Sequence, residues 1–174
     1  MSSSMENNNE PVSEYEKNLE LLRTTRFFSA VPLDAVQALA YFCRRAAYQD
    51  GGLVFRQDET DHHFYYILEG EAELLRQGPE AEKVVGRYGP GETLGGLAML
   101  AGKQRLFSLR AAKNLICLVI SREKLLGVCT KSPEFAKKLM ISLARNVIEW
   151  EERRLAENEA KGVNCLSGVG VSLI

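Results

Sequence analysis

The sequence predicts a mainly β protein, an antiparallel sandwich or barrel that is preceded and followed by helices. Between Asp50 and Ser121, short apolar runs alternate with glycine-containing turns at roughly ten-residue spacing, which is typical of antiparallel sheets. Helical periodicities occur before and after this region. The 174 residues, 45% of them hydrophobic and 26% charged, suit one globular domain and argue against a two-domain enzyme.

Two helices are predicted before the sheet. Residues 1–12 are rich in Ser, Asn and Glu and have little to bury, so we expect them to be disordered. A helical period begins at Ser13, and Glu16 three residues later completes the pattern of a capping box. A second helix follows Pro32 and places four apolar residues on one face: Val36, Leu39, Ala40 and Cys43.

Four segments carry the strand pattern. They are "GGLVFRQ" (51–57), "HFYYILEGEAELLRQG" (63–78), "EKVVGRYGPGETL" (82–94) and "RLFSLRAAKNLICLVIS" (105–121). In the second segment we expect two strand halves that bend at Gly70, because a residue without a Cβ permits the corner or bulge that a rolled sheet needs.

A short helix is predicted over 122–128, and a long one from Phe135 to about Lys161, with Ser132 at its cap and Pro133 in its first turn. The long helix carries two apolar stripes. The first stripe is Phe135, Leu139, Leu143, Val147 and Trp150; the second is Ile141, Ala144, Ile148 and Leu155. One alternative is a single broad buried face that continues into a solvated charged rod. We favour a homodimer, in which the second stripe packs against a partner helix.

Composition excludes several classes of partner. A formal net charge of -1 supplies no long-range field for nucleic acid or an anionic membrane. The start of the chain lacks the apolar core of a secretion signal, so we expect a cytoplasmic protein. The apolar, uncharged segment 162–174 is shorter than the ~20 residues of a membrane span; the alternatives for it are a disordered tail, an added strand or an interaction peptide. Four dispersed cysteines are expected to be reduced: Cys43, Cys117, Cys129 and Cys165.

Five stretches carry a resemblance to a known family. They are "VPLDAVQALA" (31–40), the turn 58–61, "FYYILEGEAEL" (64–74), "YGPGETLGGLAMLAGKQR" (88–105) and "LICLVISREKL" (115–125). The chain resembles the cyclic nucleotide-binding domain of catabolite activator proteins, cyclic-nucleotide-dependent kinases and gated channels. The resemblance implies an antiparallel β-roll of the double-stranded β-helix or jelly-roll type. N-terminal helices, a short cassette helix and a long C-terminal helix would flank it.

The resemblance also implies a site for a cyclic phosphate. In the family, backbone N–H groups at the start of the cassette helix and an Arg side chain bind this anion. The matching residues are Gly95, Gly96, Leu97 and Ala98 at the helix start, Arg105 as the phosphate-binding cation, and Ser108 near a position where the family often has a small hydroxyl residue.

Two departures from the family pattern alter this site. Gly96 stands where the family has the Glu that binds the ribose hydroxyl, and losing a bond of ~1.5–3 kcal/mol would weaken binding by about one to two orders of magnitude. Leu106 and Phe107 replace the small pair after the Arg, and strand alternation predicts that one of them lines the pocket. The neighbouring Glu92 is expected to support the turn after Pro90-Gly91, not to replace the lost carboxylate.

The same residues admit other interpretations. Arg105 taken alone would be an exposed loop cation beside Lys103, and the pair Gly95-Gly96 could be no more than a tight turn. Adjacent His62 and His63 resemble the metal motif of cupins, but neighbouring strand residues point to opposite faces, so we expect no metal. Glu69 and Glu71 flank a turn and are expected to keep a sheet edge soluble rather than to act in catalysis.

These observations predict a regulatory sensor that is not an enzyme. Cyclic AMP, cyclic GMP or another small anion would bind and signal through the C-terminal helix; no resident cofactor is expected. The alternative is a homodimeric scaffold that has lost nucleotide binding. We expect a tail (1–12), the β-roll with its N-terminal helices (13–130), a dimerisation or lid helix (131–161) and an apolar tail (162–174). Only 13 residues follow Lys161, too few for a helix-turn-helix, so no DNA binding is expected.

Overall fold

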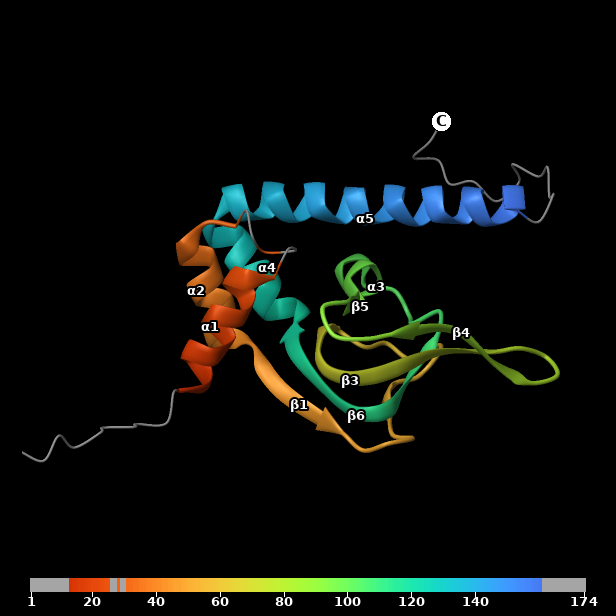
Figure 1. Ribbon diagram of the computed structural model, residues 1–174. Helices are drawn as coiled ribbons and strands as arrows, with labels where there is room; N and C mark the ends of the chain where they lie inside the picture. The colour runs from red at the N-terminus through yellow and green to blue at the C-terminus, as the bar shows by residue number, and fades with distance from the viewer. Residues whose placement is uncertain (1–12, 26–27, 29–30, 161–174) are drawn as a thin grey trace, which may run out of the picture.

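The computed structural model describes residues 13–25, 28 and 31–160 (Figure 1). The helices are α1 (Glu14–Thr24), α2 (Leu33–Phe42), α3 (Gly96–Ala101), α4 (Arg122–Lys131) and α5 (Pro133–Ala160). The strands are β1 (Arg44–Tyr48), β2 (Leu53–Phe55), β3 (His63–Gln77), β4 (Glu82–Tyr88), β5 (Thr93–Leu94) and β6 (Ser108–Ser121). This order confirms the predicted antiparallel β-roll with flanking helices, although the helices together hold more residues than the strands. The predicted tails 1–12 and 162–174 lie outside the described residues.

The strands form one antiparallel, six-stranded sheet that rolls around the two long strands β3 and β6. The sheet order is β1-β6-β3-β4, with β2 also paired to β6 and β5 to β3. The ladder between β3 and β6 shifts its register on both sides of Glu69 and Glu71, around Gly70. Gly70 has φ +81°, and a Cβ there would lie 2.1 Å from the carbonyl oxygen of Lys113. The predicted bend is therefore a bulge that only glycine can occupy.

Alternation along β3 and β6 divides the core in two. One side chain set faces the inside of the roll, and the alternate set faces the helices. The inner cluster comprises Phe55, Tyr65, Ile67, Ala72, Leu94, Leu109, Ala111, Leu115, Cys117 and Val119. The helix-facing cluster comprises Leu22, Phe28, Ala35, Val36, Leu39, Ala40, Phe64, Met99, Leu118, Ile120, Leu125, Val128, Phe135 and Leu139.

The N-terminal helices pack on each other and on the second cluster. The predicted capping box is present at α1, because the Ser13 hydroxyl accepts from the Glu16 N–H at 3.2 Å and Glu16 accepts from the Ser13 N–H at 2.9 Å. Asn18 is buried between the helices and β1; its amide donates to the carbonyl oxygens of Ala40 and Cys43, each at 3.4 Å. These bonds fix where the helical segment meets the sheet.

Helix α5 begins two residues earlier than predicted, at Pro133, and runs past α3 along one side of the molecule (Figure 1). Its first stripe faces the core: Phe135 and Leu139 are buried, and Leu143 and Val147 are half-buried. On the second stripe Ile141 is 44% exposed, Ala144 and Ile148 are exposed, and Leu155 is half-buried. The Trp150 side chain lies outside the described part. Among the described residues, no helix combines the length and apolarity that a membrane crossing requires.

Candidate functional site

The short helix α3 is set in place by a glycine with a left-handed backbone. Gly95 follows β5 as the N-cap of α3, with φ +82° and ψ -3°, a conformation that costs other L-residues ~1–2 kcal/mol. The turn before β5 is held by Glu92, whose carboxylate accepts from the Gly89 N–H at 2.7 Å. Glu92 thus supports the turn, as its position after Pro90-Gly91 predicts.

Arg105 lies beneath this helix start with its side chain only 2% exposed. Its guanidinium donates to the Gly95 carbonyl oxygen at 2.6 Å and to the carbonyl oxygen of His63. The Arg105 Cζ also lies 4.5 Å from the centroid of the Phe55 ring, within the range of a cation–π contact. The interpretation of Arg105 as an exposed loop cation is therefore wrong, since the side chain joins the cassette helix to the sheet.

The counter-ion of Arg105 is Asp61, for which the sequence pattern predicts no role. Asp61 Oδ2 accepts from Arg105 Nη2 at 2.7 Å and from Nε at 3.3 Å. The same carboxylate accepts from the Tyr65 hydroxyl at 3.0 Å and contacts His63 Nδ1 at 2.7 Å. Burial alone would raise the pKa of Asp61, but the hydrogen bonds to its carboxylate outweigh burial and hold the pKa below its ordinary value.

The two glycines of the cassette have different surroundings. A Cβ at Gly95 would lie 2.5 Å from Arg105 Nη1, so only glycine allows the guanidinium to reach the Gly95 carbonyl. A Cβ at Gly96 would lie 3.3 Å from the Phe64 ring and 3.8 Å from Leu143 Cδ2 on α5. The position of the expected family carboxylate therefore faces an apolar contact between β3, α3 and α5.

The sheet and the cassette are shared with known proteins. Residues 45–132, half of the chain, match the family model described as "Cyclic nucleotide-binding domain". The chain belongs to the cyclic nucleotide-binding domain family. The Cyclic AMP receptor protein of Thermus thermophilus is 30% identical over 125 residues, which cover 71% of this chain and 57% of that protein. The chain thus spans little more than half of that relative's length.

Two solved structures illustrate the shared fold. A cyclic nucleotide-binding domain from Methylobacillus flagellatus superposes with a TM-score of 0.72 at 20% identity, covering 87% of this chain and 86% of that one. The regulatory domain of Toxoplasma gondii PKA, crystallised with cAMP, has a TM-score of 0.61 at 21% identity, covering 72% of this chain and 50% of that one. The β-roll with its flanking helices is therefore the fold of the cyclic nucleotide-binding domain family.

The three residues after Arg105 have the following surroundings. Strand β6 begins only at Ser108, so the alternation by which one of Leu106 and Phe107 was expected to line the pocket does not apply. Leu106 is 66% exposed and Phe107 is half-buried, its ring 5.9 Å from the Arg76 guanidinium carbon. The Ser108 hydroxyl accepts from the Gln57 N–H at 2.8 Å, which ties β6 to the loop after β2.

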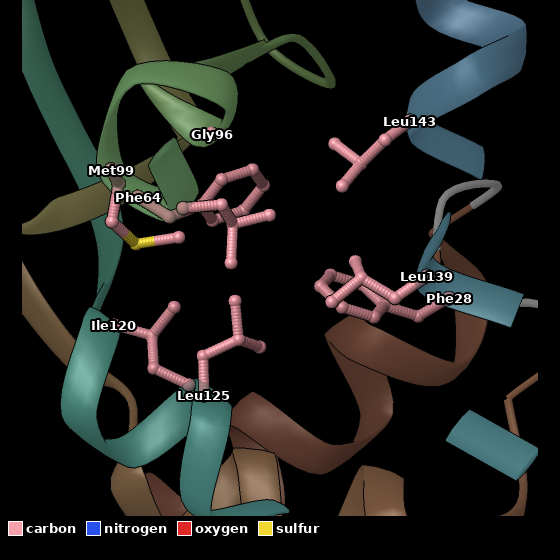
Figure 2. Close-up of a pocket in the computed structure, with 9 residues that line it drawn as sticks. Phe28, Phe64, Gly96, Met99, Ile120, Leu125, Leu139 and Leu143 are labelled. Atoms are coloured by element: carbon pink, nitrogen blue, oxygen red, sulfur yellow. The ribbon is translucent and has the colours of Figure 1, made fainter. Parts of the chain in front are cut away.

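The cavity beside the cassette is apolar (Figure 2). It lies between β3, α3, α4 and α5, and Figure 2 shows Leu139 and Leu143 of α5 facing Phe64 and Met99. Its lining consists of Phe28, Phe64, Gly96, Met99, Leu100, Ile120, Leu125, Leu139 and Leu143. Its space is about 260 Å³ even with the solvent at its mouth, below the ~300–1,000 Å³ of typical ligand pockets. This cavity lies between α5 and the roll, and its size and apolar lining do not suit a nucleotide.

Apart from His63, which contacts Asp61, the remaining chemistry-bearing residues that the sequence singled out do not converge on this site. Within residues 13–25, 28 and 31–160, no group of three or more His, Cys, Asp or Glu side chains could hold a metal ion. His62 is exposed and His63 is half-buried. Glu69 and Glu71 are exposed on either side of Gly70. Burial raises the pKa values of the Cys43 and Cys117 thiols to about 12, so both stay protonated and unreactive at neutral pH; Cys165 lies outside the described residues.

Proposed function

We propose that the chain is a regulatory ligand-sensing module in which Arg105 binds a small anionic ligand at the start of α3. The position of Arg105 carries this proposal. Its guanidinium is 2% exposed and bonds to the carbonyl oxygen of Gly95, the N-cap of the helix whose first N–H groups belong to Gly96, Leu97 and Ala98. Together these groups form the donor set that an anion requires.

Cyclic AMP or cyclic GMP is the ligand class that we propose first. Support comes from the family model and from the related regulatory domain that was crystallised with cAMP. We expect weak binding, because Gly96 offers no carboxylate to a ribose hydroxyl and its side faces Phe64 and Leu143. A small anion without a ribose would lose no affinity from the presence of Gly96 in place of the family's Glu.

The signal would pass through α5. Leu143 of α5 packs over Gly96, so a ligand that moves the cassette helix changes the contacts that hold α5 against the roll. A ligand with different affinity for the two packings of α5 would shift the population between them. Trp150 on α5 is the single tryptophan of the chain and serves as the natural fluorescent reporter.

Calorimetry with cyclic AMP, cyclic GMP and cyclic dinucleotides tests the proposal. The wild-type protein is expected to bind at least one of them and to melt at a higher temperature in its presence. Arg105→Lys should lose this stabilisation, because an ammonium cannot reproduce the planar fork of the guanidinium. Arg110→Lys, a change of the same kind on the surface of β6, should keep it. Silence of the wild type at millimolar ligand, with an unchanged melting temperature, would remove the proposed function.

A second candidate function is a scaffold that pairs through α5 without a ligand. The exposed stripe of Ile141, Ala144 and Ile148 favours it, because a helix gains stability by covering such a face. The variant Ile141→Glu/Ile148→Glu is expected to sediment as a monomer if the wild type is a dimer. Val84→Glu/Val85→Glu introduces the same charges into exposed positions of β4 and should leave the dimer intact. A wild type that is monomeric at micromolar concentration would exclude this function.

The module is further proposed to lack catalytic activity, DNA binding and a resident cofactor, and to act in the cytoplasm. The family match supports a regulatory role, since the relatives are a receptor protein and a kinase regulatory domain. The segments 13–130 and 131–161 remain our proposed division between the sensing unit and the reporting helix.

A further inference from the structure

The three acceptors around the Arg105 guanidinium are not equally movable. Two are backbone carbonyl oxygens, one at the N-cap of α3 and one at the start of β3, and both are fixed by secondary structure. The third is the Asp61 side chain, which lies in the loop before β3 and takes two of the guanidinium bonds. The bonds to these acceptors use four of the five N–H groups of an arginine. One N–H group of Nη1 remains, so an anion can take more than one guanidinium bond only by displacing the Asp61 carboxylate, the movable acceptor.

We infer that Asp61 is a specificity-determining residue that competes with anionic ligands for Arg105, and that His63 makes this competition depend on pH. The inference rests on the proposed function, because it concerns the same site. With Asp61 in place, its negative charge offsets much of the guanidinium charge, so an incoming anion is attracted more weakly than it would be by Arg105 alone. A ligand must therefore compete for Arg105 with the Asp61 carboxylate, whose Oδ2 already lies 2.7 Å from Arg105 Nη2.

A second set of contacts can hold Asp61 when it leaves Arg105. His63 Nδ1 lies 2.7 Å from Asp61 Oδ1, on the oxygen that Arg105 does not use. The Tyr65 hydroxyl donates to Asp61 Oδ2 at 3.0 Å, and His63 and Tyr65 lie on the same face of β3. The carboxylate thus stands between two partners, the Arg105 guanidinium and the His63 imidazole, and an imidazole is a side chain that gains a positive charge when it is protonated.

Protonation of His63 changes this balance in one direction. An imidazolium adds a positive charge beside Asp61, competes with Arg105 for the carboxylate charge, and leaves the cluster with a net positive charge. Within the part of the chain that the structure describes, the other titratable groups that interact with Asp61 are Tyr65 and, beyond it, Tyr48; burial raises the pKa of both, so they stay neutral. Anion affinity is therefore expected to rise as pH falls.

The first test compares cyclic AMP binding to Asp61→Asn and Glu73→Gln by calorimetry. Both variants remove one negative charge, but Glu73 pairs with Arg110 and Arg87 away from the cassette. Asp61→Asn is expected to bind cyclic AMP at least tenfold more tightly than the wild type, whereas Glu73→Gln binds as the wild type does. Equal affinity of the wild type and Asp61→Asn would overturn the inference and leave the proposed function standing. A gain in Asp61→Asn with a silent wild type would support the inference and remove the proposed function from the native chain. If neither the wild type nor Asp61→Asn binds cyclic AMP, the inference and the proposed function are both overturned.

The second test needs no change at Asp61 and covers the case in which Asp61→Asn does not fold. The wild-type affinity for cyclic AMP is measured at pH 8 and pH 6, over which a phosphodiester keeps its single charge. We expect severalfold tighter binding at pH 6, abolished in His63→Gln. His62→Gln replaces the only other histidine, which is exposed, and should keep the pH dependence. An affinity that does not change with pH, or a dependence that survives His63→Gln, would overturn the role of His63.

Discussion

Two arginine–carboxylate pairs in this protein have nearly the same geometry and different surroundings. Arg105 Nη2 lies 2.7 Å from Asp61 Oδ2, and Arg110 Nη2 lies 2.8 Å from Glu73 Oε2. Arg105 is 2% exposed beneath the cassette helix, whereas Arg110 is 34% exposed, directly opposite Glu73 in the ladder of β3 and β6. Distance alone therefore says little about what each pair contributes, because solvent screens one and not the other.

The surface pair is also part of a shared network. Glu73 accepts from Arg87 at 3.1 Å as well, and Arg110 reaches Glu82 at 3.5 Å. Each charge in this network therefore has a substitute partner. Among the described residues, Arg105 has no charged hydrogen-bond partner besides Asp61, since its other bonds end on backbone carbonyls. Removing one member should be tolerated at the surface and not at the cassette.

The largest effect is expected from Arg105→Ala compared with Arg110→Ala. Arg105→Ala leaves the half-buried Asp61 carboxylate with only the His63 and Tyr65 contacts and should lower the free energy of unfolding by about 3 kcal/mol, the lower end for a broken buried pair. Arg110→Ala should leave the unfolding midpoint close to that of the wild type, because Glu73 keeps Arg87. Urea denaturation followed by circular dichroism measures both. If the two variants lose similar amounts of unfolding free energy, burial does not make the Arg105–Asp61 pair more important for stability than the Arg110–Glu73 pair.

A backbone substitution sharpens the comparison without touching either charge. Gly91 and Gly95 both have positive φ, +91° and +82°, so alanine at either position strains the backbone by ~1–2 kcal/mol. A Cβ at Gly91 meets nothing within 4 Å, whereas a Cβ at Gly95 lies 2.5 Å from Arg105 Nη1. Gly95→Ala should therefore lower the free energy of unfolding clearly more than Gly91→Ala does in the same urea assay. Equal costs would mean that the guanidinium moves aside freely, contrary to a fixed buried pair.

Patterns that are local in the sequence predicted the local structure. The capping box at Ser13, the bulge at Gly70 and the buried stripe of α5 from Phe135 to Leu143 each depend on residues a few positions apart. The cassette helix at Gly95 was found through its resemblance to a family motif. These features determine which element forms and which face it buries.

The charge partner of Arg105 could not be predicted in this way. Asp61 is 44 residues away, and the turn 58–61 offers three acidic residues with nothing to show which one turns inward. The argument that one of Leu106 and Phe107 lines the pocket lost its basis for a related reason: alternation holds only within a strand, and β6 begins after them. Contacts across the roll depend on the register of β3 against β6, which the sequence pattern leaves open.

The pH dependence of the free energy of unfolding should distinguish the contribution of the Asp61–Arg105 pair from that of the Glu73–Arg110 pair. The hydrogen bond from Arg110 lowers the pKa of Glu73, and the bonds to Asp61 outweigh burial and lower its pKa as well. Each depressed pKa contributes stability above the ordinary value, 3.8 for Asp61, that is lost as pH falls through the folded pKa. In 1 M NaCl the screening length is ~3 Å, so the contribution of Glu73 should fade and that of Asp61 persist.

The measurement is the pH dependence of urea unfolding between pH 6 and 2 at low and high salt, for the wild type, Asp61→Asn and Glu73→Gln. The difference between the wild type and Asp61→Asn should narrow below pH 3.8 at both salt concentrations. The difference for Glu73→Gln should be small and should disappear in 1 M NaCl. A salt-sensitive contribution from Asp61 would place it in contact with solvent and weaken the distinction between the pairs.

The smallest effect is expected from the uncharged hydrogen-bond donor of the buried pair, the Tyr65 hydroxyl. Tyr65→Phe removes a hydroxyl that donates to Asp61 at 3.0 Å and should cost ~0.5–1.5 kcal/mol. Because that bond helps to lower the pKa of Asp61, its loss should also move the acid transition to higher pH. Tyr66→Phe deletes the same atom on the opposite face of β3 and should leave the transition in place. A change in stability without a change in the acid transition would indicate lost packing only, and Asp61 would then be held by Arg105 and His63 alone.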